Sequence, residues 1–173
     1  MSPKTAQKTA QKTAQKPANR IPIAGAAAAP FTLPRDGGGT VSLKDFAGQK
    51  LVLYFYPRAD TPGCTTEAID FSRLKAAFRR AGTDVLGVSA DPVAAQDKFK
   101  AKHKLAIALA SDERRKMLEA YGVWQEKALY GRKFMGIART TFLIDPDQRI
   151  AQIWPKVSVA GHAEEVLAAA KAL

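Results

Sequence analysis

The segment Leu51–Tyr56 is an uninterrupted run of apolar and aromatic side chains, and it constrains the fold more than any other part of the chain. A strand with apolar side chains on both faces must be covered on both faces, as the sheets of α/β proteins are. Pro57 ends the run, and after a short turn the sequence predicts a helix that begins between Pro62 and Cys64. Such a strand–turn–helix unit is typical of the α/β class.

The rest of the chain continues this alternation. Residues 31–33 and 40–43 flank the triplet Gly37–Gly39, which predicts a hairpin near the N-terminus. Periodicity predicts a helix that continues to Ala81, further helices over 92–104, 113–121 and 162–173, and strands over 85–90, 105–110, 140–144 and 150–154. Together these elements predict a three-layer α/β/α sandwich with a mixed sheet and an N-terminal hairpin.

The N-terminal residues differ in composition from the rest. Lys-Thr-Ala-Gln occurs three times in succession from Lys4, and residues 1–35 hold +6 of the net charge of +11. A period of four would stack these lysines on one helical face, where they repel one another. We therefore predict a disordered basic tail over 1–27 and one domain over 28–173. The tail could be solvated, bind phosphates weakly or direct targeting, although it lacks the apolar core of a secretory signal.

Composition excludes several classes of function. No run of 18 apolar residues occurs, so the sequence predicts no membrane-spanning helix. Cys64 is the sole cysteine, which rules out an internal disulfide and suits a reducing compartment, so we expect a cytoplasmic protein. His103 and His162 lie far apart without a second cysteine, so we expect no metal site, no cofactor, and a surface helix position for each histidine.

Cys64 lies in the first turn of the predicted helix. Backbone N–H groups lack intrahelical partners there, and the helix dipole places partial positive charge at the same end. Both effects favour the thiolate, which is the nucleophilic form of cysteine. The residues alone leave two readings open, a reactive thiol or a buried structural cysteine.

The residues around Cys64 resemble a known family. Pro57, Thr61 and Cys64 fit the Pro-x-x-x-Thr-x-x-Cys signature of the peroxiredoxins, and residues 54–68 closely resemble the peroxiredoxin Q subfamily, also called bacterioferritin comigratory protein. Further blocks at 31–34, 88–91, 121–124 and 135–145 occur at similar spacing, so the resemblance covers residues 28–173. It implies a thioredoxin-like fold and a thiol-dependent peroxidase.

The resemblance also implies the roles of individual residues. Cys64 corresponds to the nucleophile that attacks a peroxide oxygen and becomes a sulfenic acid. Thr61 matches the hydroxyl that positions the peroxide, Arg139 the guanidinium that stabilises the thiolate and holds the peroxide oxygens, and Pro57 the ring that shields the pocket from water. Backbone N–H groups of Gly63 and Cys64 would face the departing oxygen.

Three of these positions have a structural alternative. Thr61 can be a helix N-cap, Pro57 can simply end a strand, and Arg139 can be a surface residue at the start of a strand. Glu67 can pair with a basic group, but the sequence assigns it no role. These alternatives remain open at the level of sequence.

One position departs from the subfamily pattern. Many members carry a resolving cysteine five residues after the first, whereas this chain has Ile69 there. Five residues turn a helix by about 500°, so such a pair can bond only if the helix unwinds. We therefore expect a one-cysteine enzyme that an external thiol reduces, with thioredoxin, glutaredoxin and glutathione as candidates. We also expect Ile69 to fill core space.

The sequence thus predicts an antioxidant peroxidase for hydrogen peroxide and organic hydroperoxides, active in cell redox homeostasis. The alternative is a non-catalytic redox sensor or holdase that uses the same oxidisable Cys64. A dithiol oxidoreductase is excluded because that reaction needs two cysteines. Nucleic-acid binding through the tail is disfavoured because the tail lacks interleaved aromatic residues. The resemblance implies a monomer or weak homodimer.

Overall fold

The computed structural model describes residues 20–173, so most of the predicted tail lies outside the described residues. In chain order the elements are β1 (Thr32–Pro34), β2 (Thr40–Ser42), the 3-10 helix η1 (Leu43–Phe46), β3 (Lys50–Phe55), α1 (Pro62–Arg73), α2 (Lys75–Arg80), β4 (Thr83–Ser89), α3 (Val93–His103), β5 (Ala108–Ser111), α4 (Lys116–Ala120), β6 (Trp124–Leu129), β7 (Arg132–Ile137), β8 (Thr140–Ile144), β9 (Ile150–Trp154) and α5 (His162–Ala172).

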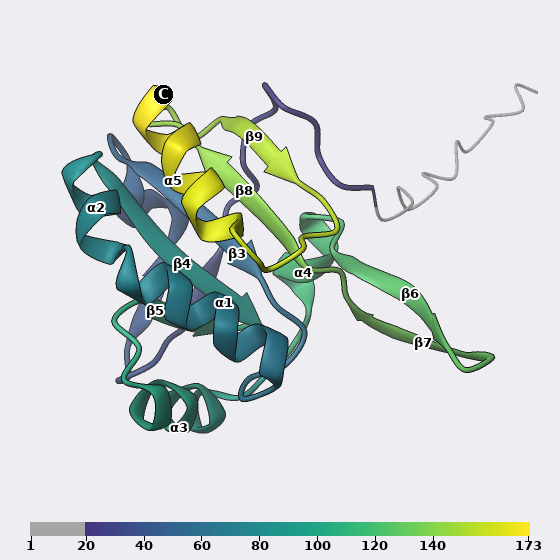
Figure 1. Cartoon of the computed structure of the whole chain (residues 1–173). Helices are drawn as coiled ribbons and strands as arrows, with labels where there is room; N and C mark the ends of the chain where they lie inside the picture. The colour runs from purple at the N-terminus through teal and green to yellow at the C-terminus, as the bar shows by residue number, and fades with distance from the viewer. Residues whose placement is uncertain (1–19) are drawn as a thin grey trace, which may run out of the picture.

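The main sheet has the strand order β5-β4-β3-β8-β9 and is mixed (Figure 1). β3 pairs in parallel with β4, and β4 pairs in parallel with β5. β8 runs antiparallel to β3, and β9 antiparallel to β8. The predicted N-terminal hairpin is present as the antiparallel pair β1–β2. Because β3 is central, its side chains face a layer of protein on each side, as the apolar run predicted.

The alternation of side chains along β3 builds two hydrophobic cores. Leu51, Leu53 and Phe55 belong to one buried cluster, which also contains residues of β1, β2 and α4. Val52, Tyr54 and Tyr56 belong to the other cluster, which contains residues of α1, α2, α3 and α5. Successive side chains of a strand point to opposite faces, so one segment anchors both outer layers.

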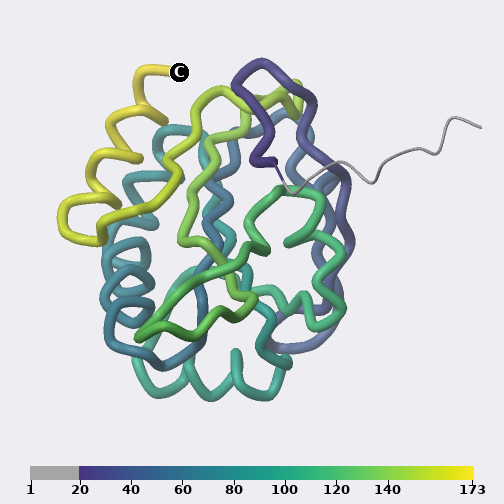
Figure 2. Tube along the Cα trace, turned by 90° about the vertical axis from the view of Figure 1, so that its right-hand side faces the viewer, coloured from purple at the N-terminus to yellow at the C-terminus, as the bar shows by residue number. Residues whose placement is uncertain are grey.

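Figure 2 shows the three layers from the side. Helices α1 and α5 form one outer layer, the sheet lies in the middle, and the N-terminal residues with α4 form the other. This arrangement confirms the predicted three-layer sandwich with a mixed sheet and an N-terminal hairpin. None of the helices in the described part of the chain is long and apolar enough to cross a membrane.

The structure corrects several predicted elements. The single predicted helix to Ala81 is divided at Leu74, which joins α1 to α2. Arg115 has a positive φ of 62°, so α4 begins at Lys116 rather than at residue 113. The chain between α4 and β8 forms the hairpin β6–β7, which the sequence did not predict and which projects from the body of the molecule (Figure 1).

His162 was expected on a helix surface, and this prediction was wrong. The residue opens α5 but is only 4% exposed, and its Nε2 lies 2.8 Å from the Thr141 hydroxyl of β8. Burial lowers the pKa of His162 below its usual value. His103 keeps partial exposure, with 21% of its side chain accessible.

Part of the segment assigned to the predicted tail contacts the fold. The Gly25 N–H donates to the Ile150 carbonyl at 2.7 Å, and Ala27 forms an isolated antiparallel bridge with Arg149. Ile21 packs against the cluster that contains β1 and β2. Contacts with the β8–β9 hairpin therefore begin before residue 28, while the nature of residues 1–19 stays a prediction.

Candidate active site

The site is built around the N-terminus of α1. Thr61 is the N-cap residue, Pro62 occupies the first helical position, and Cys64 is the third helical residue. Proline lacks an N–H group and its fixed φ suits this position, so it starts the helix at no cost in hydrogen bonds. The first intrahelical bond runs from the Thr65 N–H to the Thr61 carbonyl, which leaves the N–H groups of Gly63 and Cys64 without intrahelical partners.

Arg139 is the partner of the Cys64 sulfur. It precedes β8, and its Nη2 donates to Cys64 Sγ at 3.3 Å although 75 residues separate the two. Cys64 is 2% exposed, so this contact is largely shielded from solvent. A Cβ on Gly63 would lie 3.2 Å from Arg139 Nη2, so the glycine leaves room for the guanidinium. The guanidinium therefore places a positive charge beside the sulfur.

Glu67 holds the other arm of the same guanidinium. It lies one turn after Cys64 on α1, and Arg139 Nη1 donates to its Oε1 at 2.8 Å. Glu67 is 1% exposed, and burial raises the pKa of its carboxyl to about 7 despite the opposing influence of Arg139. Burial alone would lower the pKa of Arg139, but Glu67 and Cys64 raise it above its usual value. Arg139 therefore remains charged against the sulfur.

Two buried polar atoms beside this pair have no hydrogen-bond partner within residues 20–173. They are Oε2 of Glu67 and the hydroxyl oxygen of Tyr54. Burial raises the pKa of Tyr54, and the charges of Glu67 and Cys64 raise it further, so the phenol stays neutral. Buried polar groups are usually paired, so these two atoms are exceptions that lie close to the sulfur.

The loop between β3 and α1 is held by neighbouring elements. The Ala59 N–H donates to the Asp91 carboxylate at 2.8 Å. Asp60 has a positive φ of 59° and lies 2.8 Å from both Lys102 Nζ and His103 Nε2 at the end of α3. These contacts, first His103 and then Lys102, lower the pKa of Asp60. The loop that carries Thr61 is thus fixed from the α3 side.

Pro57 and Thr61 lie at the two ends of this loop. Pro57 lies two residues after the end of β3 and is half-buried. The Thr61 hydroxyl donates to the Arg58 carbonyl at 2.8 Å and makes no capping hydrogen bond to the helix. Thr61 is therefore an N-cap by position but not by its side chain, and its oxygen lone pairs remain able to accept.

Lys127 is a cation near the site that the sequence did not reveal. It lies on β6 and is half-buried. A Cβ on Gly136 of β7 would lie 3.2 Å from the Lys127 Cδ, so the aliphatic part of the lysine side chain crosses the facing strand at that glycine. Burial lowers the pKa of Lys127, Arg139 lowers it further, and Cys64 raises it. No sequence signal could identify this residue, because the hairpin that carries it was not predicted.

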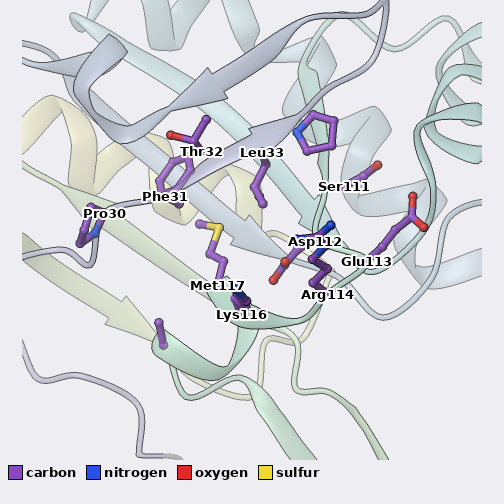
Figure 3. A pocket seen from close by; sticks show the side chains of 12 residues that line it. Pro30, Phe31, Thr32, Leu33, Ser111, Asp112, Glu113, Arg114, Lys116 and Met117 are labelled. Atoms are coloured by element: carbon purple, nitrogen blue, oxygen red, sulfur yellow. The ribbon is translucent and has the colours of Figure 1, made fainter.

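A separate cavity lies elsewhere in the molecule. It has a volume of about 670 Å³, and Figure 3 shows Phe31, Leu33 and Met117 along it, with Asp112 beside them. Asp112 accepts the Leu118 N–H at 2.9 Å, and burial raises the pKa of its carboxyl. These apolar residues belong to the cluster on the other face of the sheet from Cys64. The cavity is therefore separate from the sulfur site.

The structure brings together Cys64, Gly63 and Arg139, as predicted, and adds Glu67, Tyr54 and Lys127. Within residues 20–173, no group of three or more His, Cys, Asp or Glu side chains could hold a metal ion. Ile69 was expected in the core, and this prediction was wrong because the side chain is 43% exposed. Five residues separate it from Cys64, which places the two on different faces of α1.

Comparisons with known proteins identify relatives over most of the chain. The model of the AhpC/TSA family matches residues 24–153. Peroxiredoxin Bcp of Xanthomonas campestris is 48% identical over 147 residues, which is 84% of this chain and 92% of the relative. Peroxiredoxin Bcp of Bacillus subtilis is 44% identical over 143 residues, which is 83% of this chain and 91% of the relative.

Solved structures show the same relationship. Peroxiredoxin Q of Xanthomonas campestris superposes with a TM-score of 0.79 at 47% identity and covers 82% of this chain and 90% of its own. A cysteine-to-serine variant of PrxQ from Xylella fastidiosa superposes with a TM-score of 0.83 at 40% identity and covers 88% of this chain and 97% of its own. The matched family model, these relatives and the shared fold together show that the chain belongs to the AhpC/TSA family. Within that family it is a peroxiredoxin of the Bcp type, a group of thiol-dependent peroxidases.

Proposed function

We propose that Cys64 is the peroxidatic nucleophile of this enzyme. The thiolate attacks the nearer oxygen of a hydroperoxide, an S–O bond forms, and the O–O bond breaks. The cysteine is oxidised to a sulfenic acid, and the peroxide is reduced to water or an alcohol after the departing oxygen takes up a proton. The observation that carries this proposal is the 3.3 Å contact between Arg139 Nη2 and the buried Cys64 sulfur.

The surrounding groups supply what the attack requires. Arg139 stabilises the thiolate and offers its guanidinium to the peroxide oxygens. The unpaired N–H groups of Gly63 and Cys64 face the space before α1, where negative charge develops on the departing oxygen. The Thr61 hydroxyl already donates to Arg58, so it is oriented to accept a hydrogen bond from the peroxide. Half-buried Pro57 limits the access of water.

The second half-reaction uses an external thiol. Cys64 is the only cysteine of the chain, so its sulfenic acid cannot condense with an internal thiol. A first external thiol displaces water to form a mixed disulfide, and a second thiol releases Cys64 by disulfide exchange. Thioredoxin, glutaredoxin and glutathione all supply this chemistry. We place this cycle in cytoplasmic antioxidant defence, performed by a monomer or weak homodimer.

Hydrogen peroxide and organic hydroperoxides are the proposed substrates. One structure of the Xanthomonas relative is described by its alkyl peroxide reduction activity. Both substrate types present the same O–O bond to the sulfur, so the proposed machinery serves either. Comparing the second-order rate constants for hydrogen peroxide and an alkyl hydroperoxide will rank the two.

Steady-state turnover with excess peroxide and a thioredoxin or glutathione reducing system tests the proposal. We expect many turnovers per Cys64 in the wild type and none above the uncatalysed rate for Cys64→Ser. Thr66→Ser, an exposed change on the same helix, serves as the control and should keep full activity. A single oxidation without turnover would instead support the redox sensor, and turnover by Cys64→Ser would overturn the assignment of the nucleophile.

A further inference from the structure

Three adjoining hollows on the face around α2 share their lining residues. A hollow of about 520 Å³ shares Lys75, Arg79 and Ala106 with a second hollow of about 230 Å³. It shares Arg80 with a third hollow of about 300 Å³. The three therefore form one continuous surface, which extends from the C-terminal end of α5 across α2 toward β5 (Figure 1). We name it the α2 basic surface.

The charge of this surface is one-sided. Among the lining residues in the described chain, Asp84 is the only acidic side chain. Lys75 Nζ donates to the Ala106 carbonyl at 2.8 Å and Lys50 Nζ to the Ala170 carbonyl, so neither charge is neutralised. Five cations have no carboxylate within ion-pair distance inside residues 20–173: Lys50, Lys75, Arg79, Arg80 and Lys171.

The cations of α2 are concentrated on its solvent side, with Arg79 and Arg80 in its last turn. Lys75 and Arg79 stand four residues apart on the same helix, where like charges destabilise it. Phe78 is the residue of α2 that packs in the core, and the cations point outward. A polyanion that neutralises them would relieve the repulsion and release its own counterions.

We propose that the α2 basic surface binds the phosphate backbone of nucleic acid without sequence specificity. Lysine and arginine contacts to successive phosphates supply such binding on their own. A lipid headgroup carries the same charge, but peripheral helices that bind membranes also insert large apolar side chains. The outward residues of α2 are Lys75, Ala76, Arg79 and Arg80, so this helix offers no such insertion.

The position of the surface leaves the peroxidase site free. Arg73, at its edge, stands nine residues after Cys64 on α1, a rise of about 13 Å along the helix. A protein reductant must reach the sulfur, so a surface at the opposite end of α1 does not suit that partner. Bound nucleic acid would instead keep the peroxidase close to a polymer that peroxides damage.

Fluorescence anisotropy with a labelled 20-base-pair duplex at several salt concentrations tests this inference. The test variant is Lys75→Gln/Arg79→Gln/Arg80→Gln. The control removes three exposed charges elsewhere, Lys44→Gln/Arg114→Gln/Arg132→Gln. A second control, Lys4→Gln/Lys8→Gln/Lys12→Gln, removes three charges of the N-terminal repeats. Peroxidase turnover of each variant is measured without DNA.

We expect wild-type binding that weakens with salt and does not depend on duplex sequence. The test variant should lower the slope of log K against log salt by about 3, since each lost phosphate contact contributes about 0.9. Both controls should bind more tightly than the test variant, and all variants should keep full turnover. Absence of binding by the wild type at low salt, equal losses in a control, or binding to anionic vesicles but not DNA would each overturn the inference and leave the peroxidase assignment intact.

Discussion

Two Arg–Glu pairs involve α1, one in its N-terminal half and one at its last residue, and they differ in how burial affects the pKa of the glutamate. Near the N-terminus, Glu67 and Arg139 have 1% and 18% of their side chains exposed. At the C-terminus, Arg73 pairs with Glu164 of α5, and about half of each side chain is exposed. Burial raises the pKa of Glu67 to about 7, whereas Arg73 lowers the pKa of Glu164.

This difference shows that the same residue types serve two purposes on one helix. The exposed pair connects α1 to α5 in water, where ion pairs contribute little to stability. The buried pair is costly to desolvate, and it lies next to Cys64. The bond to Glu67 holds the guanidinium so that its other nitrogen, Nη2, faces the Cys64 sulfur.

Among the changes considered, removing Arg139 should have the largest effect on activity and stability. Arg139→Ala deletes the cation beside Cys64, so we expect the rate constant with peroxide to fall by about 10²–10³-fold, as for loss of one preorganised donor. It also leaves Glu67 buried without a partner, at a cost of about 3–5 kcal/mol when that carboxyl is ionised. Stopped-flow oxidation and urea unfolding at pH 8 measure the two effects.

Acidification provides the control for Arg139→Ala. Below pH 5 Glu67 is protonated, so the variant should regain most of its lost stability while its peroxidase rate stays low. A variant that is equally unstable at both pH values would show that Glu67 is not the cause.

The buried Glu67 should also make the stability of the protein depend on pH. The folded pKa of Glu67, about 7, is above its usual value of 4.5, so the folded state binds the extra proton between these values. Its contribution is therefore fully present below pH 4.5 and is lost as the pH rises through 7, by on the order of 2–4 kcal/mol. Glu67→Gln should remove this loss.

Urea unfolding from pH 4.5 to pH 8 measures the difference between wild type and Glu67→Gln. The quantity to compare is the difference in unfolding free energy between the two proteins at each pH. The lowered pKa of His162 makes stability rise with pH in both proteins, opposite to the effect of Glu67, and this shared trend cancels in the difference. Parallel curves would show that Glu67 does not titrate in this range.

Breaking the exposed pair should have a much smaller effect. Arg73→Ala leaves Glu164 in water, so we expect no resolvable change in the urea midpoint at pH 7 and unchanged peroxidase activity. Because the pKa of Glu164 is lowered in the folded protein, any stability that this pair contributes is present at pH values above the usual titration range of a glutamate. That stability is lost as the pH falls. A loss of stability comparable to that of Arg139→Ala would contradict the distinction between the two ends.

Ile69→Cys, between the two ends, should perturb the fold least. Because Ile69 is 43% exposed, the change should cost within about 0.5 kcal/mol. Cys64 and position 69 lie on different faces of α1, so a disulfide between them requires the helix to unwind. After peroxide treatment, mass spectrometry should find an internal disulfide in this variant and sulfinic acid in the wild type. Overoxidation of both proteins to the same extent would show that α1 does not open.

The sequence was most informative where burial is uniform. The run Leu51–Tyr56 predicted a strand covered on both faces, and the structure confirms it with two separate clusters. The N-terminal hairpin and the hairpin of β8 and β9 were also confirmed. These elements carry their pattern locally, so no knowledge of distant contacts is needed.

The hairpin β6–β7 was missed because its residues are largely exposed. Exposure removes the apolar alternation by which a half-buried strand is recognised. The break at Leu74 was missed because Phe71 and Phe78 keep helical spacing across it. Local pattern does not show where a helix bends to follow the core.

The site shows the same limit. Helix-start signals predicted the environment of Cys64, but the contact with Arg139 spans 75 residues and came from family resemblance alone. The buried Glu67 and the nearby Lys127 depend on tertiary packing, which assigns a partner and a protonation state to residues that look like surface charges in sequence.

Gly63 has a consequence for how this enzyme can vary. Even alanine there would bring a methyl group to 3.2 Å from the guanidinium that contacts Cys64. The absence of a side chain at Gly63 therefore determines how closely the arginine can approach the sulfur. A family member with a larger residue at this position would have to hold its arginine differently, so the identity of one small residue reports whether this contact between arginine and sulfur is retained.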